Sequence, residues 1–175
     1  MNEPIEQLDY NFSDSLKIEK INGKIYLMAT PADEHIDVQV NLAYIFTDYF
    51  RRNKKRCAAR TEARLDIDAN NFFKPDLMIL CYNNSEHTPL IVIEILSNST
   101  RERDLGVKME KYAQLGIKEY WIITWEISAI DIYLLTADKS YKIYKSYSYL
   151  RETQFSPVSI PELTVNIDDV FYFVK

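Results

Sequence analysis

Two acidic residues stand in segments that otherwise have the composition of a protein interior. Residues 90–96 form an apolar, β-branched run that is typical of a strand buried on both faces, and Glu94 alone interrupts it. Because side chains alternate along a strand, Glu94 shares a face with Val92. The preceding apolar run, residues 75–80, carries Asp76 near its start. If the two strands are neighbours in one sheet, the two carboxylates can approach each other.

Two close carboxylates in a protein core need a partner. An isolated buried carboxylate is unfavourable by several kcal/mol, and two that lie close together repel, so that one takes up a proton. A hard divalent cation such as Mg²⁺ prefers oxygen ligands, is often held by one or two carboxylates, and removes this repulsion. The alternative is an ion pair between each acid and a local lysine or arginine. Sequence spacing alone favours that alternative.

The segment after the Glu94 strand adds a cation. Residues 100–115 predict a helix, and Gly116 stands where a left-handed C-cap residue belongs. Within it, Asp104, Lys108 and Tyr112 follow one another at intervals of four and therefore share a helix face. If this face packs on the sheet, Lys108 can reach the carboxylates and orient a water or stabilise charge on a phosphate. The alternative is a surface pair of Asp104 and Lys108 worth a few tenths of a kcal/mol.

The elements that must position these residues follow from turn signals and hydrophobic periodicity. An Asn22-Gly23 turn predicts a hairpin, and Thr30-Pro31 predicts the start of a long helix that ends near Arg52. The apolar set of this helix, which includes Ile36 and Val40, predicts burial on more than one side. The expected strands are residues 16–21, 24–28, 57–67, 75–82, 89–97, 119–125, 130–136 and 141–147.

This order of elements predicts a mixed α/β fold with one central sheet flanked by helices. The chain has 175 residues, a length suited to one domain, and no Pro/Gly-rich linker divides it. We therefore expect a single domain over residues 1–175, with the N-terminal hairpin and the C-terminal strands as extensions of its core.

Composition excludes several classes of protein. With 47% apolar residues and only 3 glycines, the chain is neither disordered nor able to form a Rossmann glycine fingerprint or a P-loop. The cysteines, Cys57 and Cys81, form no C-x-x-C motif, and the histidines, His35 and His87, are far apart, which argues against zinc. No apolar run approaches the length of a membrane span. We expect a cytoplasmic protein with both thiols reduced.

Charge is distributed unevenly. The net charge is −5, yet residues 51–64 hold seven basic residues and one acid. Such a segment can mark a surface that meets phosphate, or it can be the solvated end of a helix whose cations favour the C-terminal dipole. Within and beside it, Glu62 and Asp66 could add metal ligands, but ion pairs with Arg60 or Arg64 are the simpler expectation.

The chemically informative motifs resemble one family. The sequence is similar to the Uma-type restriction endonuclease family of bacteria, over a region from about Ser15 to Phe171. That family belongs to the PD-(D/E)XK nuclease superfamily, so the resemblance implies a restriction endonuclease-like core in which a mixed sheet is flanked by helices. The motifs that carry it are Pro75-Asp76, Ile93-Glu94-Ile95-Leu96-Ser97-Asn98-Ser99-Thr100, Asp104 with Lys108 and Tyr112, and Gly116-Ile117-Lys118-Glu119-Tyr120-Trp121.

The resemblance implies a role for each matching residue. Asp76, Glu94 and the backbone carbonyl of Ile95 would bind Mg²⁺, with Mn²⁺ as a substitute. The superfamily's lysine normally stands two residues after the second acid, where this chain has Leu96, so Lys108 is expected to supply the cation. A smaller departure is Asn98 where the family usually has proline. The residues expected to support the site are His35, at its edge, and Ser97, Asp104 and Tyr112, which would hold Glu94 and Lys108 in place.

The implied activity is Mg²⁺-dependent hydrolysis of phosphodiester bonds in DNA, by a homodimer because two cuts need two sites. The alternative, from a different class, is a catalytically silent protein that keeps the fold and binds nucleic acid or regulates a partner. The acidic isoelectric point, about 5.1, keeps this alternative open. Titration with Mg²⁺ or Mn²⁺ separates the two, because a silent protein need not bind metal at these acids.

Overall fold

The computed structural model describes residues 17–82, 88–97 and 99–174. Its centre is a six-stranded sheet with the order β10-β9-β8-β7-β6-β3. Strands β7 and β8 run parallel, and the other neighbours are antiparallel, so the sheet is mixed as predicted. In chain order these strands are β3(Cys57–Thr61), β6(Leu77–Cys81), β7(Ile91–Ile95), β8(Glu119–Thr124), β9(Ala129–Leu135) and β10(Tyr141–Ser148).

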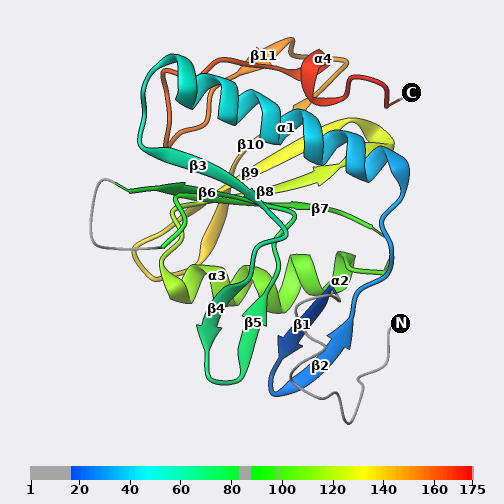
Figure 1. The fold of residues 1–175 in the computed structure, drawn as a ribbon, viewed down its shortest axis with the longest axis vertical. Coiled ribbons are helices and arrows are strands. Elements are labelled where there is room, and N and C mark those ends of the chain that lie inside the picture. The colour runs from blue at the N-terminus through cyan, green and yellow to red at the C-terminus, as the bar shows by residue number, and fades with distance from the viewer. Residues whose placement is uncertain (1–16, 83–87, 98, 175) are drawn as a thin grey trace.

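Helices cover both faces of this sheet (Figure 1). On one face lies α1(Asp33–Arg52), beside the C-terminal elements β11(Gln154–Phe155), β12(Val165–Asn166) and α4(Ile167–Val170). On the other face, α2(Arg101–Arg103), a π-helical turn η2(Asp104–Lys108) and α3(Met109–Leu115) form one helical segment. A short 3₁₀ turn, η3(Trp125–Ile127), follows β8. This mixed α+β arrangement is the predicted fold class.

A second, four-stranded sheet with the order β2-β1-β5-β4 lies on the α3 side of the central sheet (Figure 1). It contains the predicted hairpin, β1(Ile18–Ile21) and β2(Lys24–Leu27), whose Asn22-Gly23 turn has positive φ at both positions. The other two strands are β4(Leu65–Asp68) and β5(Asn71–Phe73). The predicted strand 57–67 is therefore two strands in different sheets, and β5 was not predicted.

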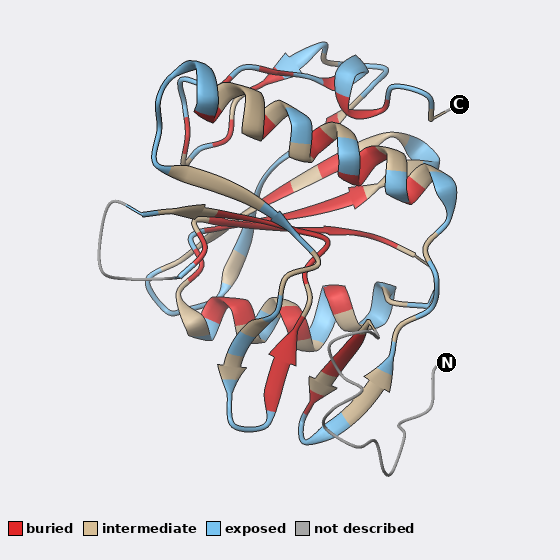
Figure 2. Ribbon diagram, viewed as in Figure 1, coloured by how far each residue is buried: buried red, intermediate tan, exposed pale blue. Residues whose placement is uncertain are grey.

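Helix α1 buries one broad face. Its buried residues recur along one side of the helix, which Figure 2 colours as buried, and four of them, Val38, Leu42, Phe46 and Phe50, belong to the core cluster that includes strands of the central sheet. The prediction of burial on more than one side is wrong, because Ile36 and Val40 are 38% and 58% exposed. Acidic residues in the first turn and basic residues in the last turn stabilise the helix by interacting favourably with its dipole. The buried residues are His35, Val38, Gln39, Leu42, Phe46 and Phe50.

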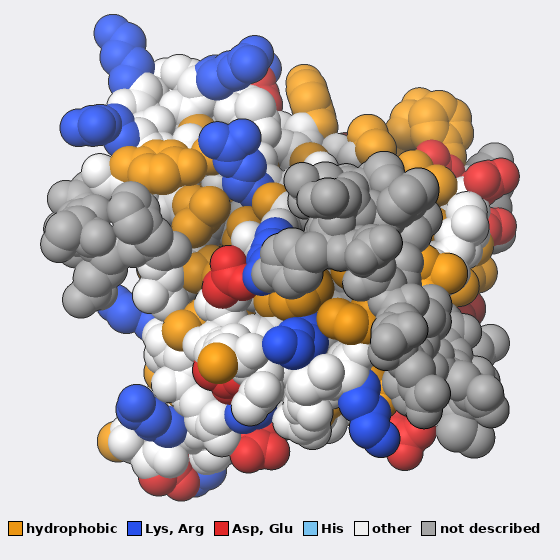
Figure 3. Space-filling view, turned by 60° about the horizontal axis from the view of Figure 1, so that its bottom comes forward, with side chains coloured by type: hydrophobic (Ala, Val, Ile, Leu, Met, Phe, Trp, Pro, Cys, Tyr) orange, Lys and Arg blue, Asp and Glu red, His pale blue; other side chains and the backbone are white. Residues whose placement is uncertain are grey.

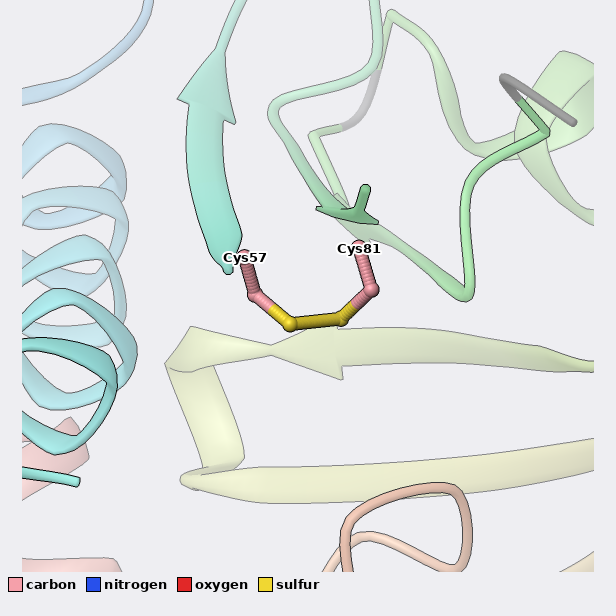
Figure 4. The surroundings of a disulfide bond; sticks show 2 residues. All are labelled: Cys57 and Cys81. Carbon is pink, nitrogen blue, oxygen red and sulfur yellow. A yellow bond between two sulfur atoms is a disulfide. The ribbon is translucent and has the colours of Figure 1, made fainter. Parts of the chain in front are cut away.

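The two cysteines form a disulfide, so the prediction of reduced thiols is wrong. Antiparallel pairing of β3 with β6 places Cys57 directly opposite Cys81, and Figure 4 shows their side chains pointing toward each other. A separation of 24 residues in the sequence gave no indication of this register. Within the described ranges, no helix is long and apolar enough to span a bilayer. The start of the predicted hairpin strand, Leu16, and the Asn98 connection lie outside the described residues.

Candidate active site

The structure brings Asp76 and Glu94 together at one end of two neighbouring strands. Strands β6 and β7 pair so that Leu77 lies opposite Ile93, which places Asp76, just before β6, beside Glu94. The backbone N–H of Asp76 lies 3.4 Å from Glu94 Oε2. Both residues are buried, with 5% and 1% of their surface exposed. Two carboxylates therefore meet inside the protein, between α1 and the η2 turn.

Asp76 is held as an anion by the groups around it. Its Oδ2 accepts the backbone N–H of Ile95 at 2.8 Å and lies 3.2 Å from His35 Nε2. The Lys17 ammonium donates to Oδ1 at 3.1 Å. Burial alone would raise the pKa of Asp76, but the contacts with His35, Lys17 and Ile95 hold that pKa well below its ordinary value. Gln39 donates to the backbone carbonyl of Asp76 at 2.7 Å and fixes the start of β6.

The surroundings of Glu94 shift its pKa in the opposite direction from that of Asp76. Its Oε1 accepts hydrogen bonds from the Tyr112 hydroxyl at 2.7 Å and the Lys108 ammonium at 3.2 Å. Burial raises the pKa of Glu94 well above its ordinary value, and the nearby carboxylates of Asp104 and Asp76 raise it further, although Lys108 opposes them. Within the part of the chain that the structure describes, its second oxygen, Oε2, makes one hydrogen bond, the long contact with the backbone N–H of Asp76.

Lys108 is the centre of a buried ion cluster. Its ammonium lies 2.8 Å from Glu19 Oε1, 3.0 Å from Asp104 Oδ1 and 3.2 Å from Glu94 Oε1. Although burial alone would lower the pKa of Lys108, these carboxylates raise it well above its ordinary value. The interpretation of Asp104 and Lys108 as a surface pair is wrong, because both side chains are only 2% exposed. The π-helical turn that contains both residues is a conformation that recurs at functional sites.

The donor set fits a divalent cation. The buried acidic side chains of Glu19, Asp76, Glu94 and Asp104 face two lysines, Lys17 and Lys108, so acidic groups outnumber ammonium groups by two. Asp76 and Glu94 line a cavity of about 70 Å³, which has room for an ion with water. Among the described residues, no three His, Cys, Asp or Glu side chains are arranged so that they could hold one metal ion. Two carboxylates suit Mg²⁺, which keeps several of its waters.

Comparison with known proteins places the chain in a family. The sequence pattern of the Uma2 family, described as "Putative restriction endonuclease", matches residues 3–168. The chain belongs to this family. Over 137 residues it is 24% identical to the uncharacterized protein slr1290 of Synechocystis sp., covering 74% of this chain and 72% of that protein.

The Uma2 fold is also that of a solved structure. A crystal structure described as a putative nuclease belonging to DUF820, from Anabaena variabilis, superposes with a TM-score of 0.73. The similarity covers 90% of this chain and 91% of that one, at 18% sequence identity. This likeness bears on the fold, and it agrees with the restriction endonuclease-like core that the motifs implied.

The supporting residues of this Uma2-family chain do not all take the places expected of them. Tyr112 contacts Glu94, and Asp104 contacts Lys108, as the resemblance implied. His35 lies against Asp76 itself. Ser97 lines the cavity, but its hydroxyl bonds to Ser99 and Thr100 at the start of the helical segment, with Thr100 Oγ1 at 3.0 Å. It therefore organises the connection to α2 and makes no hydrogen bond to the residues that it was expected to hold.

Three residues of the site were not predicted. Lys17 contacts Asp76, Glu19 contacts Lys108, and Gln39 contacts the backbone of Asp76. Gln39 carried a usable signal, because it stands four residues after His35 in the buried stripe of α1. Lys17 and Glu19 come from the N-terminal end of the described chain, and their two-residue spacing gave no indication of the distant partners.

The basic segment is spread over the surface. Its cations, from Arg51 to Arg56 and at Arg60 and Arg64, are exposed. Figure 3 shows Lys and Arg side chains at several places on the face that carries the second sheet, with acidic side chains between them. Asp66 pairs with Arg64 at 2.7 Å as expected. Glu62 instead pairs with Lys17, at 2.8 Å.

Proposed function

We propose that this protein is a Mg²⁺-dependent endonuclease that hydrolyses phosphodiester bonds in DNA, with Mn²⁺ able to replace Mg²⁺. The observation that carries the proposal is the pair of adjacent buried carboxylates, Asp76 and Glu94, facing a small cavity in a chain of the Uma2 family. We further propose that the protein acts in the cytoplasm, as a homodimer that supplies one site for each strand of duplex DNA.

Asp76, Glu94 and the backbone carbonyl of Ile95 would hold the metal ion. Asp76 Oδ1 and Glu94 Oε2 are the carboxylate oxygens with fewest other bonds, since Oδ2 of Asp76 and Oε1 of Glu94 each have two close partners. When bound there, Mg²⁺ would polarise the scissile phosphate and lower the pKa of a water molecule.

In the proposed reaction a water oxygen attacks the phosphorus in line with the leaving oxygen. A new bond forms between phosphorus and the water oxygen, and the bond between phosphorus and the leaving oxygen breaks. The attacking water gives up a proton to solvent, and the leaving oxygen takes one from solvent. Lys108 balances the charge of Glu19, Asp104 and Glu94, and so keeps Glu94 oriented toward the cavity. His35 fixes the Asp76 carboxylate from the side of α1.

The experiment compares cleavage of supercoiled plasmid and of oligonucleotides by three proteins, each with Mg²⁺ and with a chelator. Wild type is expected to cleave only with the metal, and Asp76→Asn should lose about 100-fold or more of its activity. A matched control, Asp66→Asn, removes an exposed carboxylate and should cleave like wild type. Equal activity of all three proteins, or none in any of them on every substrate, would refute the proposal.

A second candidate function is a catalytically silent protein that binds nucleic acid or a regulatory partner. The observation that favours it is the ion pairing of both acids, Asp76 with Lys17 and Glu94 with Lys108, which satisfies them without a metal. Calorimetric titration with Mn²⁺ separates the two functions. The nuclease binds Mn²⁺ and loses it on Asp76→Asn, whereas the silent protein shows no binding that depends on Asp76.

A further inference from the structure

The Lys108 ammonium is enclosed by carboxylates. Those of Glu19, Asp104 and Glu94 lie within 3.2 Å of it, and it donates a hydrogen bond to Glu94 Oε1. The side chain lines the cavity that Asp76 and Glu94 share but is only 2% exposed, so a phosphate oxygen has little room to approach it. Lys108 can orient Glu94, but a reacting group would have to enter this ion cluster to reach its ammonium.

Lys17 lines the same cavity and is more open to it, because its side chain is 18% exposed. Its ammonium donates to Asp76 Oδ1 at 3.1 Å and to Glu62 Oε1 at 2.8 Å. Among the contacts of the described residues, this leaves one of its three N–H groups for a ligand. Lys17 is thus a cation at the mouth of the site, in contact with the oxygen proposed to bind metal.

Glu62 gives Lys17 a second anchor. Its carboxylate is 37% exposed and belongs to the bend between β3 and β4, where Glu62 adopts a positive φ of 50°. When Asp76 Oδ1 turns to a metal ion, the bond to Glu62 can keep the ammonium beside the cavity. The position that holds lysine in the superfamily motif is Leu96, which is 2% exposed and packs in the core cluster with Val92. The site therefore needs a cation from another element.

We propose that Lys17 is the catalytic lysine of this site, that Glu62 positions it, and that Lys108 acts only through Glu94. The inference rests on the nuclease function proposed above. As the water oxygen bonds to phosphorus, negative charge grows on the non-bridging phosphate oxygens, and the Lys17 ammonium donates a hydrogen bond to one of them. Lys17 transfers no proton in this step.

The test removes the ammonium of Lys17 and then restores it chemically. Both cysteines of the chain are in the disulfide, so Lys17→Cys introduces the one free thiol, provided that no reductant is present. Alkylation with 2-bromoethylamine returns an ammonium at nearly the original length, whereas iodoacetamide adds a neutral group of similar size. Lys20→Cys, in strand β1 that begins just after Lys17, receives both treatments as the control; Lys20 donates to the Ala69 carbonyl at 2.9 Å.

We expect Lys17→Cys to lose about 10²–10³-fold in kcat. The ethylamine adduct should recover at least tenfold of this and the acetamide adduct none. The Lys20 proteins should retain most of the wild-type kcat. A second readout needs no turnover: Lys17→Met should bind Mn²⁺ at least as tightly as wild type, because the ammonium competes for Asp76 Oδ1, while Asp76→Asn should lose binding.

Two results would overturn this inference alone, given a wild type that cleaves DNA. One is a Lys17→Cys protein as active as wild type. The other is an ethylamine adduct no more active than the acetamide adduct. Weaker Mn²⁺ binding by Lys17→Met would also contradict it, since it would make Lys17 a support of the metal site. A wild type inert on every substrate would refute the nuclease function, and this assignment with it.

Discussion

Replacing Lys108 by methionine tests whether the buried ion cluster holds the site together. Methionine keeps most of the length and the apolar stem of lysine but removes the charge. The structure then leaves the carboxylates of Glu19, Asp104 and Glu94 next to one another with no cation among them. Among the described residues, Glu19 Oε2 lacks a hydrogen-bond partner, and Oε1 keeps the backbone N–H at position 74, at 3.1 Å, when Lys108 is removed.

The size of the effect follows from this burial. Breaking a buried ion pair by removing one partner destabilises proteins by about 3–5 kcal/mol, and the whole free energy of unfolding is typically about 5–15 kcal/mol. For a chain of this length each kcal/mol lowers Tm by about 2–4 °C, so Tm should fall by about 6–20 °C. The matched control is Lys111→Met on the same helical segment, whose lysine makes a part-exposed pair with Asp68 at 3.4 Å. Its loss should not exceed about 1 kcal/mol.

The assay is urea denaturation of both variants in a chelating buffer, so that no metal ion replaces the lost ammonium. The loss in Lys108→Met should be larger at pH 8 than at pH 5. Burial raises the pKa of Glu94 and Lys108 opposes that rise, so removal of Lys108 raises the pKa further and the folded variant keeps a proton that the unfolded chain has released. The stability of the variant therefore falls as pH rises from the pKa of Glu94 in the unfolded chain toward its pKa in the folded variant. A Lys108→Met protein no less stable than Lys111→Met at pH 8 would refute the reasoning.

Three further predictions concern the frame around the site. Glu119→Ala should lower the free energy of unfolding by about 3 kcal/mol or more in urea titration. The buried carboxylate accepts the Trp121 ring N–H at 2.8 Å and the backbone N–H groups of residues 158 and 159, which the variant leaves without this acceptor. A loss no larger than that of an exposed acid would contradict this role. Gly116→Ala should cost about 1–2 kcal/mol, since φ is +89° while no atom lies within 4 Å of the added Cβ; a more stable variant would be the opposing result. Reduction of the Cys57–Cys81 bond should cost about 3 kcal/mol, seen as a lower Tm with reductant, and thiol titration of the oxidised protein should find no reactive thiol; two titratable thiols would exclude the bond.

Local signals in the sequence were sufficient for many of the elements. The Asn22-Gly23 hairpin, the helix after Pro31 and the strand around Glu94 depend on turn chemistry and short-range periodicity, which act within a few residues. The bend that separates β3 from β4 has no such signal, because Glu62 adopts a positive φ without glycine or proline nearby. Strand β5 has three residues, too few for a periodic pattern.

Features that depend on how strands pair, or on the exact hydrogen bonding of a helix, could not be predicted from the sequence. The disulfide requires Cys57 and Cys81 to face each other across β3 and β6, and pairing register is set by the whole sheet. The π-helical turn at residues 104–108 is likewise invisible to a pattern of i, i+4 spacings, since side-chain types alone do not distinguish it from α-helix.

The two acids of the candidate site, Asp76 and Glu94, could be predicted from the sequence, but of its cations Lys108 was predicted and Lys17 was not. Asp76 and Glu94 stand out because carboxylates are rare inside apolar strands. The partners of these acids come from an element far away in the sequence: 59 residues separate Lys17 from Asp76. A lysine or glutamate near a short strand is ordinary on its own. The role of Lys17 and Glu19 becomes visible only in the folded structure, where they contact Asp76 and Lys108.

The proposed function requires that Asp76 and Glu94 together bind a divalent cation. Diffraction from crystals soaked in Mn²⁺, measured at a wavelength where manganese scatters anomalously, can locate that ion. We expect an anomalous peak about 2.1 Å from Asp76 Oδ1 and Glu94 Oε2, with the Lys17 ammonium moved off Oδ1 and still bonded to Glu62. Soaked crystals with no peak at this place, and with Lys17 still bonded to Asp76, would contradict it.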